Sequence, residues 1–411
     1  MPEFLKLIPT QQALEILLSH VEVKENKERV KTIDSLGRVT AQTISSPIPL
    51  PPFPRSTVDG YAVRAGDTFG ASDSLPAYLN LIGEVNMGSA VDFDISQGEA
   101  AIIHTGGMLP GSCNAVVMVE YTQSVNENTV EIFRSVAPGE NIIKVGEDVF
   151  VGEEVIKCGV RIRPAEIGGI SALGILEIDV AKKPVVGLIS SGDEVVPPEN
   201  KLMPGQVRDI NSYTLSALID RTGGIARRYG IFPDDFQKIK IVAEQAFDEC
   251  DMLVITAGSS ASVRDITADV INTLGTPGVL VHGVSIKPGK PTILAVCDHK
   301  VVIGLPGNPV SALVIAGFYV VPVIELLLGL PGAGSYIRFQ ARVSTNVPSL
   351  AGREDWVAGH LSSDASGYIV EPIFSKSNLI FSLVRANCLI RVPADATGLS
   401  AGELVEIQLL N

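Results

Sequence analysis

Polar side chains follow several apolar runs in the middle of the chain, where a ligand could bind. Asp193 and Glu194 come after "VVGLIS", and Asp234 comes after "ARRYGIF". Lys287 and Lys290 come after "LVHGVSI", in the segment "KPGK". Lysines attract phosphate groups, and carboxylates supply the hard oxygen ligands that Mg²⁺ prefers. These residue types predict a site for a phosphorylated or nucleotidyl ligand with a divalent metal.

Two further segments suit an anion. Ser259 and Ser260 lie in "TAGSSAS", and "GNPVS" opens a long apolar stretch. Free N–H groups at a helix N-terminus or in a Ser- and Gly-rich turn bind phosphate. Each of these residues taken singly also fits an ordinary turn or helix cap. The sequence has no Walker A, GxGxxG or GxSxG motif, so the pattern by itself predicts only an anion and metal site.

The elements that must position these residues alternate from residue 184 onward. Helices are predicted for "SYTLSALIDRTG", "DDFQKIKIVAEQAFDEC" and "ITADVINTLG", and buried strands for "PVVGLIS", "IARRYGIF", "DMLVITAG" and "VVIGLPG". This spacing is typical of βαβ units, so we predict an α/β domain with a mainly parallel sheet. Ligands of such sheets bind beyond the carboxyl ends of the strands, which is where the polar residues fall.

The rest of the chain favours short strands, and its 411 residues exceed the usual size of one domain. We predict an elongated N-terminal domain from residues 1–46 and 146–177, and a β-rich second domain from residues 47–145. Residues 178–330 form the α/β domain, and residues 331–411 form a small C-terminal β domain. The predicted fold is therefore multidomain, α/β plus β.

Composition excludes some classes of protein. The net charge of −14 argues against a general nucleic-acid binder, whose affinity comes from cationic contacts. The five cysteines are scattered and form no CxxC motif, so we expect reduced thiols in a cytoplasmic protein, without a disulfide or a zinc site. The apolar segment 309–328 has most of the length of a membrane span, but it contains Pro322 and Glu325. We interpret it as a buried helix and expect no membrane association.

Residues 51–64, "PPFPRSTVDGYAVR", form neither a helix nor a strand pattern, because three prolines precede an acid and a glycine. Together with other segments in the same order, this loop resembles the molybdopterin molybdenumtransferase family, whose relatives include the gephyrin E domain. The resemblance runs from about residue 10 to the end of the chain. The segments that carry it include "RSTVDGYAV", "HTGGMLPGSCNAVVMVEYT", "GENIIKVGEDV", "SSGDEVV", "DINSYTL", "KPGKPTILA", "GLPGNPVSALV" and "GELVEIQLL".

The resemblance implies a four-domain homodimer in which the α/β domain of one subunit faces the second domain of the other. It implies that adenylylated molybdopterin and molybdate react in the presence of Mg²⁺ to give molybdenum cofactor and AMP. It also allows a transient contact with the molybdopterin adenylyltransferase. The proline-clamped loop would present Asp59 across the dimer interface, held at low entropic cost by its fixed φ angles.

The resemblance assigns roles to individual residues of this chain. Asp59 and Thr105 would face the site from the second domain, and Asp148 in "GEDV" matches a functional acid. Glu194 matches an acid associated with metal or molybdate handling, and with Asp59 it is a candidate metal ligand. Asp265 in "VRDIT" matches an acid of the pterin–nucleotide pocket and is expected to be catalytic.

The same resemblance places further residues in the ligand pocket. Asp234 matches an acid of the pterin–nucleotide pocket, and Lys287 matches a basic residue there, with Lys290 beside it. The remaining implied contacts are Pro306 and Pro309 in "GLPGNP", and Arg353 and Ser377 in the last domain. These residues join Ser259 and Ser260 as the expected cofactor-binding set.

The chain departs from the family pattern at three places. "AGSSASV" stands where many members have a glycine-rich loop, Gly283 stands where a lysine is common, and "SKSN" surrounds Ser377. These differences bear on contacts in the pocket and leave the preference between molybdate and tungstate open. Two other functions also remain open: a non-catalytic molybdopterin-binding scaffold of the gephyrin type, and a molybdopterin adenylyltransferase.

Overall fold

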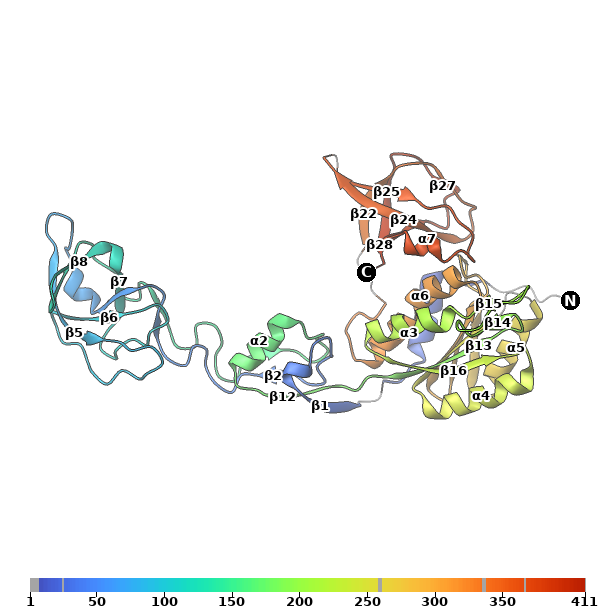
Figure 1. Cartoon of the computed structure of the whole chain (residues 1–411), viewed down its shortest axis with the longest axis horizontal. Coiled ribbons are helices and arrows are strands. Elements are labelled where there is room, and N and C mark those ends of the chain that lie inside the picture. The colour runs from blue at the N-terminus through green and yellow to red at the C-terminus, as the bar shows by residue number, and fades with distance from the viewer. Residues whose placement is uncertain (1–6, 24–25, 258–260, 335–337, 366, 411) are drawn as a thin grey trace.

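The structure is a computed structural model of the chain. It describes residues 7–23, 26–257, 261–334, 338–365 and 367–410, with the backbone alone for residues 261–265. Figure 1 shows an elongated molecule, with an arm of two units at one side and two further units packed together at the other. The arm comes from the N-terminal half of the chain, and the other two units, called the C-terminal units here, come from the C-terminal half.

The part of the arm nearer the C-terminal units is built from strands that are far apart in sequence. Strand β1 (Lys27–Lys31) pairs with β12 (Glu177–Ala181), and β2 (Ile44–Ser45) pairs with β11 (Glu154–Ile156). Helix α2 (Pro164–Ala172) covers them, and the 3₁₀ turn Thr32–Asp34 follows β1. Since β12 pairs with β1, this unit extends a few residues beyond the predicted boundary at 177.

Helix α1 (Thr10–Ser19) falls in the range predicted for the N-terminal domain but packs elsewhere. Its buried residues Ala13, Leu14 and Leu17 belong to the hydrophobic core of the α/β domain. Helix α1 is amphipathic, and its apolar face contacts α6 (Pro309–Leu327) and β20 (Ile293–Cys297). The chain therefore starts against the α/β domain before it enters the arm.

The outer part of the arm is one six-stranded sheet in the order β7-β4-β6-β5-β9-β8. Its strands are β4 (Gly60–Val63), β5 (Ala77–Glu84), β6 (Glu99–Ile103), β7 (Ala115–Met118), β8 (Thr122–Asn126) and β9 (Thr129–Ile132). The short pair β3 (Arg55–Ser56) and β10 (Ile142–Ile143) adjoins it, and 3₁₀ turns span Ala65–Thr68 and Val119–Tyr121. Neighbouring strands are antiparallel except β5 and β6, which are parallel.

The α/β domain contains the predicted sheet, in the order β16-β13-β17-β21-β20-β18. Its other strands are β13 (Val185–Ser191), β16 (Ile225–Phe232), β17 (Met252–Ala257), β18 (Pro277–His282) and β21 (Lys300–Pro306). The pairings give β16, β13, β17, β21 and β18 one direction and reverse β20, so the sheet is mainly parallel as predicted. The carboxyl ends of the strands that share a direction lie along one edge.

Helices cover both faces of this sheet. Helix α3 (Asn211–Thr222), together with α1 and α6, packs in one hydrophobic cluster, and α4 (Phe236–Glu249) and α5 (Ala261–Asn272) pack in another. Strand β17 serves both clusters, because Val254 points into the first and Leu253 and Ile255 point into the second. The short strands β14 (Val195–Val196) and β15 (Val207–Arg208) pair beside the sheet edge.

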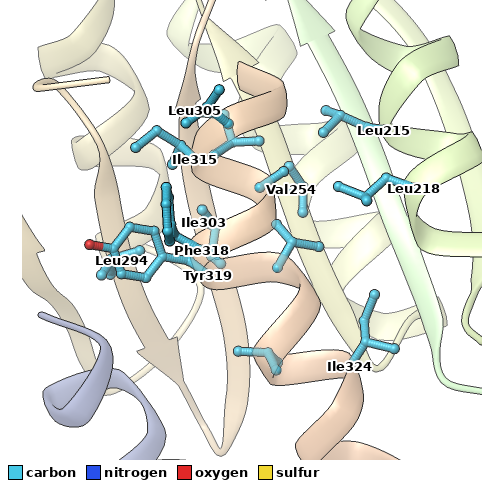
Figure 2. Packing of buried hydrophobic residues seen from close by; sticks show 14 of the residues in the cluster. Leu215, Leu218, Val254, Leu294, Ile303, Leu305, Ile315, Phe318, Tyr319 and Ile324 are labelled. Atoms are coloured by element: carbon cyan, nitrogen blue, oxygen red, sulfur yellow. The ribbon is translucent and has the colours of Figure 1, made fainter. Parts of the chain in front are cut away.

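The apolar segment 309–328 is the core helix α6, as the sequence indicated. Figure 2 shows Ile315, Phe318, Tyr319 and Ile324 of this helix pointing into a cluster that also contains Leu215 and Leu218 of α3 and the labelled sheet residues. The helix is long and apolar enough to cross a membrane by composition, but 67% of its most apolar window is buried in the domain. Burial against the sheet accounts for its hydrophobicity.

The last unit is a small barrel. Its sheet runs β24-β25-β22-β28-β26, and a further pairing of β26 with β24 closes it. Its elements are β22 (Arg338–Val343), β23 (Val347–Pro348), β24 (Glu354–Asp364), β25 (Gly367–Pro372), α7 (Phe381–Val384), β26 (Cys388–Val392), β27 (Gly398–Leu399) and β28 (Leu404–Leu409). A strand from the α/β domain, β19 (Ile286–Lys287), pairs in parallel with β24 and joins the two domains.

Candidate active site

A cleft of 630 Å³ lies between the α/β domain and the C-terminal barrel. Five of the residues implied for the ligand pocket line it, namely Lys287, Lys290, Pro306, Arg353 and Ser377. With Lys376 and Asp355, the charged residues of the cleft carry a net charge of +3. The remaining lining is largely apolar, so the cleft combines apolar side chains with several cations, which suits an anionic organic ligand.

The "KPGK" segment reaches this cleft because it connects β19 to the start of β20 at the carboxyl edge of the sheet. Gly289 in this loop has a φ of 109°. A β-carbon at Gly289 would overlap the side chain of Ile315 in α6, so only glycine lets the loop lie this close to the helix. The loop is thereby fixed by packing on α6, with Lys287 and Lys290 both exposed.

A buried acid that sequence reasoning missed joins two of the cations. Asp355 is 2% exposed, and its Oδ1 accepts a hydrogen bond of 2.9 Å from Nε of Arg353. Its Oδ2 lies 3.5 Å from Nζ of Lys287. A signal was present in the sequence, because Asp355 stands two residues after Arg353 in a strand-like run, and such residues share a face.

Ser377 holds the C-terminal barrel against the first turn of α6. Its hydroxyl accepts a hydrogen bond of 3.1 Å from the Asn308 amide, and its carbonyl accepts one of 3.1 Å from the Val310 N–H. Pro309 is the first residue of α6 and has no N–H. We expected the N-terminus of α6 to bind phosphate. One of its N–H groups, that of Val310, is instead hydrogen-bonded to Ser377 of the C-terminal domain.

Acidic residues gather at the other end of the same edge, after β13 and β16. Asp193 and Glu194 are exposed, and Asp193 Oδ1 accepts a hydrogen bond of 3.3 Å from the Asp234 N–H. Burial raises the pKa of Asp234, the neighbouring Ser191 hydroxyl partly offsets this, and the charges of Asp193 and Glu194 raise that pKa further. The three acids are therefore close enough to repel one another.

Several buried polar atoms beside these acids lack a hydrogen-bond partner among the described residues. They are Oδ1 of Asn211, Oδ1 of Asp234 and Oγ of Ser191, and the last two lie close enough for the serine hydroxyl to lower the pKa of Asp234. Buried polar atoms are paired in most folded proteins, so three at one sheet edge indicate a place for a polar ligand or a cation. Asn211 also donates 2.8 Å to the Gly307 carbonyl, which links this group to the "GLPGNP" segment beside the cleft.

Three predicted residues cannot be assigned contacts. Ser259 and Ser260 lie outside the described residues. Asp265 lies in α5, where the structure describes the backbone alone. The end of β17, which precedes these residues, lies between β13 and β21 at the centre of the sheet edge.

Asp59 and Thr105 are brought together in the outer part of the arm. The Thr105 N–H donates 2.9 Å to Oδ1 of Asp59, and this bond is the main cause that lowers the pKa of Asp59. Gly60 is required next to Asp59, because a β-carbon there would overlap the Val117 carbonyl of β7. The "VDG" turn thus brings strand β4 against β7 and leaves the Asp59 side chain exposed.

His104 beside this acid was missed by sequence reasoning. Its Nε2 lies 2.8 Å from Glu84 Oε1, and its Nδ1 lies 3.6 Å from Asp59 Oδ1. The hydrogen bond to Glu84, with the charges of Glu84 and Asp59, raises the pKa of His104. The only sequence signal was its place immediately before Thr105 in "HTGG".

Asp148 lies where the two units of the arm are joined. Its N–H donates 3.0 Å to the Leu50 carbonyl, and the Gly146 N–H donates 3.1 Å to the Pro51 carbonyl. The proline-rich segment is therefore fixed along residues 146–149, and the Asp148 side chain is exposed. Asp59, Thr105 and Asp148 all lie in the arm, well away from the cleft of the same chain (Figure 1).

The two candidate metal ligands are not neighbours within one chain. Glu194 lies at the sheet edge, and Asp59 lies in the outer part of the arm. Among the described residues, no group of three or more histidine, cysteine or acidic side chains could hold a metal ion by itself. The clustered carboxylates near Glu194 are nevertheless hard oxygen donors whose mutual repulsion a cation would relieve.

Three family models match consecutive parts of the chain. They are the MoeA N-terminal region (domain I and II) over residues 8–174, a probable molybdopterin binding domain over residues 187–326, and the MoeA C-terminal region (domain IV) over residues 340–410. Together these matches cover both the cleft and the arm.

Similar proteins match over nearly the full length. The chain is 35% identical to a putative molybdopterin biosynthesis protein of Methanocaldococcus jannaschii, covering 98% of each. It is 31% identical to the molybdopterin molybdenumtransferase of Haemophilus influenzae, covering 98% of this chain and 99% of that protein. A crystal structure of a molybdopterin biosynthesis protein from Pyrococcus horikoshii OT3 is 32% identical, with a TM-score of 0.86 over 98% of this chain and 100% of that one.

Proposed function

The chain belongs to the MoeA family, and on that premise we propose that it is a molybdopterin molybdenumtransferase. It inserts molybdate into adenylylated molybdopterin and releases AMP with the finished molybdenum cofactor. The function belongs to molybdenum cofactor biosynthesis, as the names of the relatives indicate.

The observation that best supports this function is the cationic cleft at the carboxyl edge of the sheet. Molybdate is an anion, and the adenylylated pterin carries phosphates, so a site for both must overcome their repulsion. Lys287, Lys290 and Arg353 supply positive charge, and the apolar side chains suit the organic part of the ligand. In this proposal these side chains bind and orient the anionic groups.

We propose that the acidic end of the edge handles Mg²⁺ and the remaining polar contacts. Glu194 would hold the ion together with substrate phosphates, and Asp234 would accept a hydrogen bond from the ligand at its unpaired Oδ1. When bound, Mg²⁺ would neutralise phosphate charge as AMP leaves. The geometry that supports these roles is the clustering of carboxylates beside unpaired polar atoms.

A homodimer is part of the proposal, because one chain does not bring its own candidate residues together. Asp59, Thr105 and Asp148 lie in the arm, and the cleft lies in the opposite half of the molecule. A second copy whose arm reaches this cleft would complete the site. Cytoplasmic location and transient contact with a molybdopterin adenylyltransferase stay proposals of the same kind.

The two alternative functions are not favoured. The family models cover the arm and the barrel as well as the α/β domain, and full-length relatives are named molybdenumtransferases. A non-catalytic scaffold has no need for repelling acids beside unpaired polar atoms, which the sheet edge contains.

The decisive experiment follows AMP release from adenylylated molybdopterin with and without molybdate. We expect release that requires molybdate and Mg²⁺ and that stops when EDTA is added. A scaffold would bind the ligand without releasing AMP, and an adenylyltransferase would convert ATP and molybdopterin instead. Running tungstate in parallel would settle the choice of oxyanion.

The shared site has a separate test in subunit mixing. Asp59→Asn and Lys287→Ala alter different halves of the proposed site, so each homodimer should have low activity when the adenylylated pterin is kept well below saturation. Mixed dimers would contain one site with neither substitution, and activity should return when the variants are unfolded and refolded together. Failure of mixing to restore activity, or a monomer at micromolar concentration in sedimentation equilibrium, would contradict the shared site.

A further inference from the structure

One buried carboxylate lies behind two cations of the cleft. Asp355 is 2% exposed, and its two oxygens are divided between Arg353 and Lys287. Burying a charged group is costly unless it is paired and hydrogen-bonded. Here both conditions are met by residues that line the cleft, so the acid is tied to the site rather than to the barrel core.

The backbone determines this arrangement. Strand β19 pairs in parallel with β24, and the register sets Lys287 opposite Asp355. The Glu354 N–H also donates 2.9 Å to the Ser285 carbonyl, which fixes the same junction. Lys287 comes from the α/β domain, and Arg353 and Asp355 come from the barrel side, so one carboxylate sets the spacing of cations from two domains.

Within the part of the chain that the structure describes, these contacts leave donors of both cations free for a ligand. Arg353 uses its Nε toward Asp355, which leaves the two terminal nitrogens of its guanidinium group, and its side chain is 33% exposed. Lys287 lies 3.5 Å from Asp355 and is 58% exposed. Each cation thus contacts Asp355 while its side chain stays partly exposed. This arrangement is expected of side chains that are oriented before a ligand binds.

We propose that Asp355 is a positioning residue for anion binding in the cleft, acting through Lys287 and Arg353. The inference rests on the proposed function only in taking molybdate as the anion. Without Asp355, the cleft would carry more net positive charge but its cations would not be held in place. The added positive charge alone would raise the affinity for molybdate, whereas the loss of fixed positions for Lys287 and Arg353 would lower it. We infer that the loss of fixed positions has the larger effect.

The test compares Asp355→Asn with a matched control one residue away. Glu354 is on the same strand, pairs with Arg391 and lines a different pocket, so Glu354→Gln removes a neighbouring ion-paired carboxylate, 13% exposed, without touching the cleft. Molybdate alone is the probe, and its binding is measured by calorimetry beside thermal unfolding of each variant.

We expect Asp355→Asn to weaken molybdate binding by about ten- to a hundredfold, the range for losing a group that orients a ligand-binding residue. Glu354→Gln should keep the wild-type affinity even where its thermal stability falls as far. In a Lys287→Ala, Arg353→Ala background, Asp355→Asn should change the affinity little further, because the residues through which it acts are gone. If Asp355 had a purely structural role, Asp355→Asn would lower thermal stability, as Glu354→Gln does, and would leave the affinity for molybdate unchanged.

Each outcome decides the question. Unchanged or tighter molybdate binding in Asp355→Asn overturns the proposal, and so does a full additional loss in the double-substituted background. If Asp355→Asn does not fold, Asp355→Glu keeps the charge and moves it by one methylene, and the same loss of affinity is expected. Absence of molybdate binding by the wild-type protein would also overturn it. AMP release is measured separately, so failure of the proposed reaction with intact molybdate binding would leave the role of Asp355 standing.

Discussion

The two ends of the sheet edge balance their charges in different ways. At the basic end, Lys287 and Arg353 share buried Asp355 as a counter-charge. At the acidic end, Asp234 has a raised pKa and an Oδ1 that, within the described residues, has no hydrogen-bond partner. At the basic end the cations share a counter-charge within the protein, whereas at the acidic end the carboxylates have no cation beside them among the described residues.

This difference indicates that the two ends of the sheet edge have different functions. A pre-oriented cationic site binds an anion with little rearrangement, so it favours affinity. Groups that are unfavourable in the free protein gain most when a partner arrives, and functional sites commonly hold such groups. We therefore expect substitutions at the basic end to alter binding and substitutions at the acidic end to alter turnover.

The largest expected effect is at Glu194. Glu194→Gln keeps the shape of the side chain and removes its charge, so molybdate-dependent AMP release should fall by about a hundredfold, the scale of losing a metal-positioning group. Binding of the adenylylated pterin should persist, because the lysines remain. Asp193→Asn is the control on the same loop and should do less. A wild-type rate for Glu194→Gln across a magnesium titration would remove this acid from the metal step.

The next effect concerns the loop that carries the lysines. Gly289→Ala should destabilise the α/β domain by about 2–3 kcal/mol, from overlap with Ile315 and from strain at positive φ. Gly402→Ala is a matched control, because Gly402 also has positive φ but open space around it. Equal losses of unfolding free energy in the two variants would mean that packing on α6 does not fix the loop.

Lys287→Ala tests the basic end directly. We expect binding of the adenylylated pterin to weaken about tenfold, the scale of losing one hydrogen bond to a charged group, with a smaller change in turnover at saturating ligand. Lys240→Ala is the control, since Lys240 lies on α4 in a surface pair with Glu244. An unchanged dissociation constant would exclude Lys287 from ligand binding.

The smallest effect should be a gain in stability at the acidic end. The folded-state pKa of Asp234 is raised, so ionisation of Asp234 disfavours the folded state above that pKa. Asp234→Asn should therefore raise the melting temperature slightly at pH 7 in EDTA. The gain should shrink as the pH falls and Asp234 becomes protonated in the wild-type protein. Equal melting temperatures of Asp234→Asn and the wild-type protein at pH 7 would mean that the ionised Asp234 does not destabilise the fold, which would contradict the prediction.

The sequence predicted those features that depend on nearby residues. Alternating apolar runs located the strands and helices of the α/β domain, and residues just after β13 located Asp193 and Glu194. The mainly parallel sheet then explains why these lie along one edge. Lys287 and Lys290 were expected after a single strand "LVHGVSI", but β18 ends at His282 and Lys287 belongs to β19, which pairs with the barrel.

Features that depend on distant pairing were not accessible from local pattern. Arg353 and Ser377 entered only through the family resemblance, because nothing near them in the sequence points to the cleft. Asp355 and His104 were missed altogether. The pairing of β19 with β24 is two residues long and joins segments far apart in sequence, and a pairing so short gives no periodic signal.

Strand β19 also limits how the α/β domain and the C-terminal barrel can be exchanged between proteins in engineered chimaeras. This strand belongs to the α/β domain but pairs with β24 of the barrel, and the Ser377 carbonyl accepts a hydrogen bond from the first turn of α6. A barrel excised at residue 331 would expose the backbone of Glu354 and Asp355 at an unpaired edge, which invites strand addition by other chains. A transplant that carries the β19 segment with the barrel would keep that edge covered, so the two domains behave as one unit of exchange.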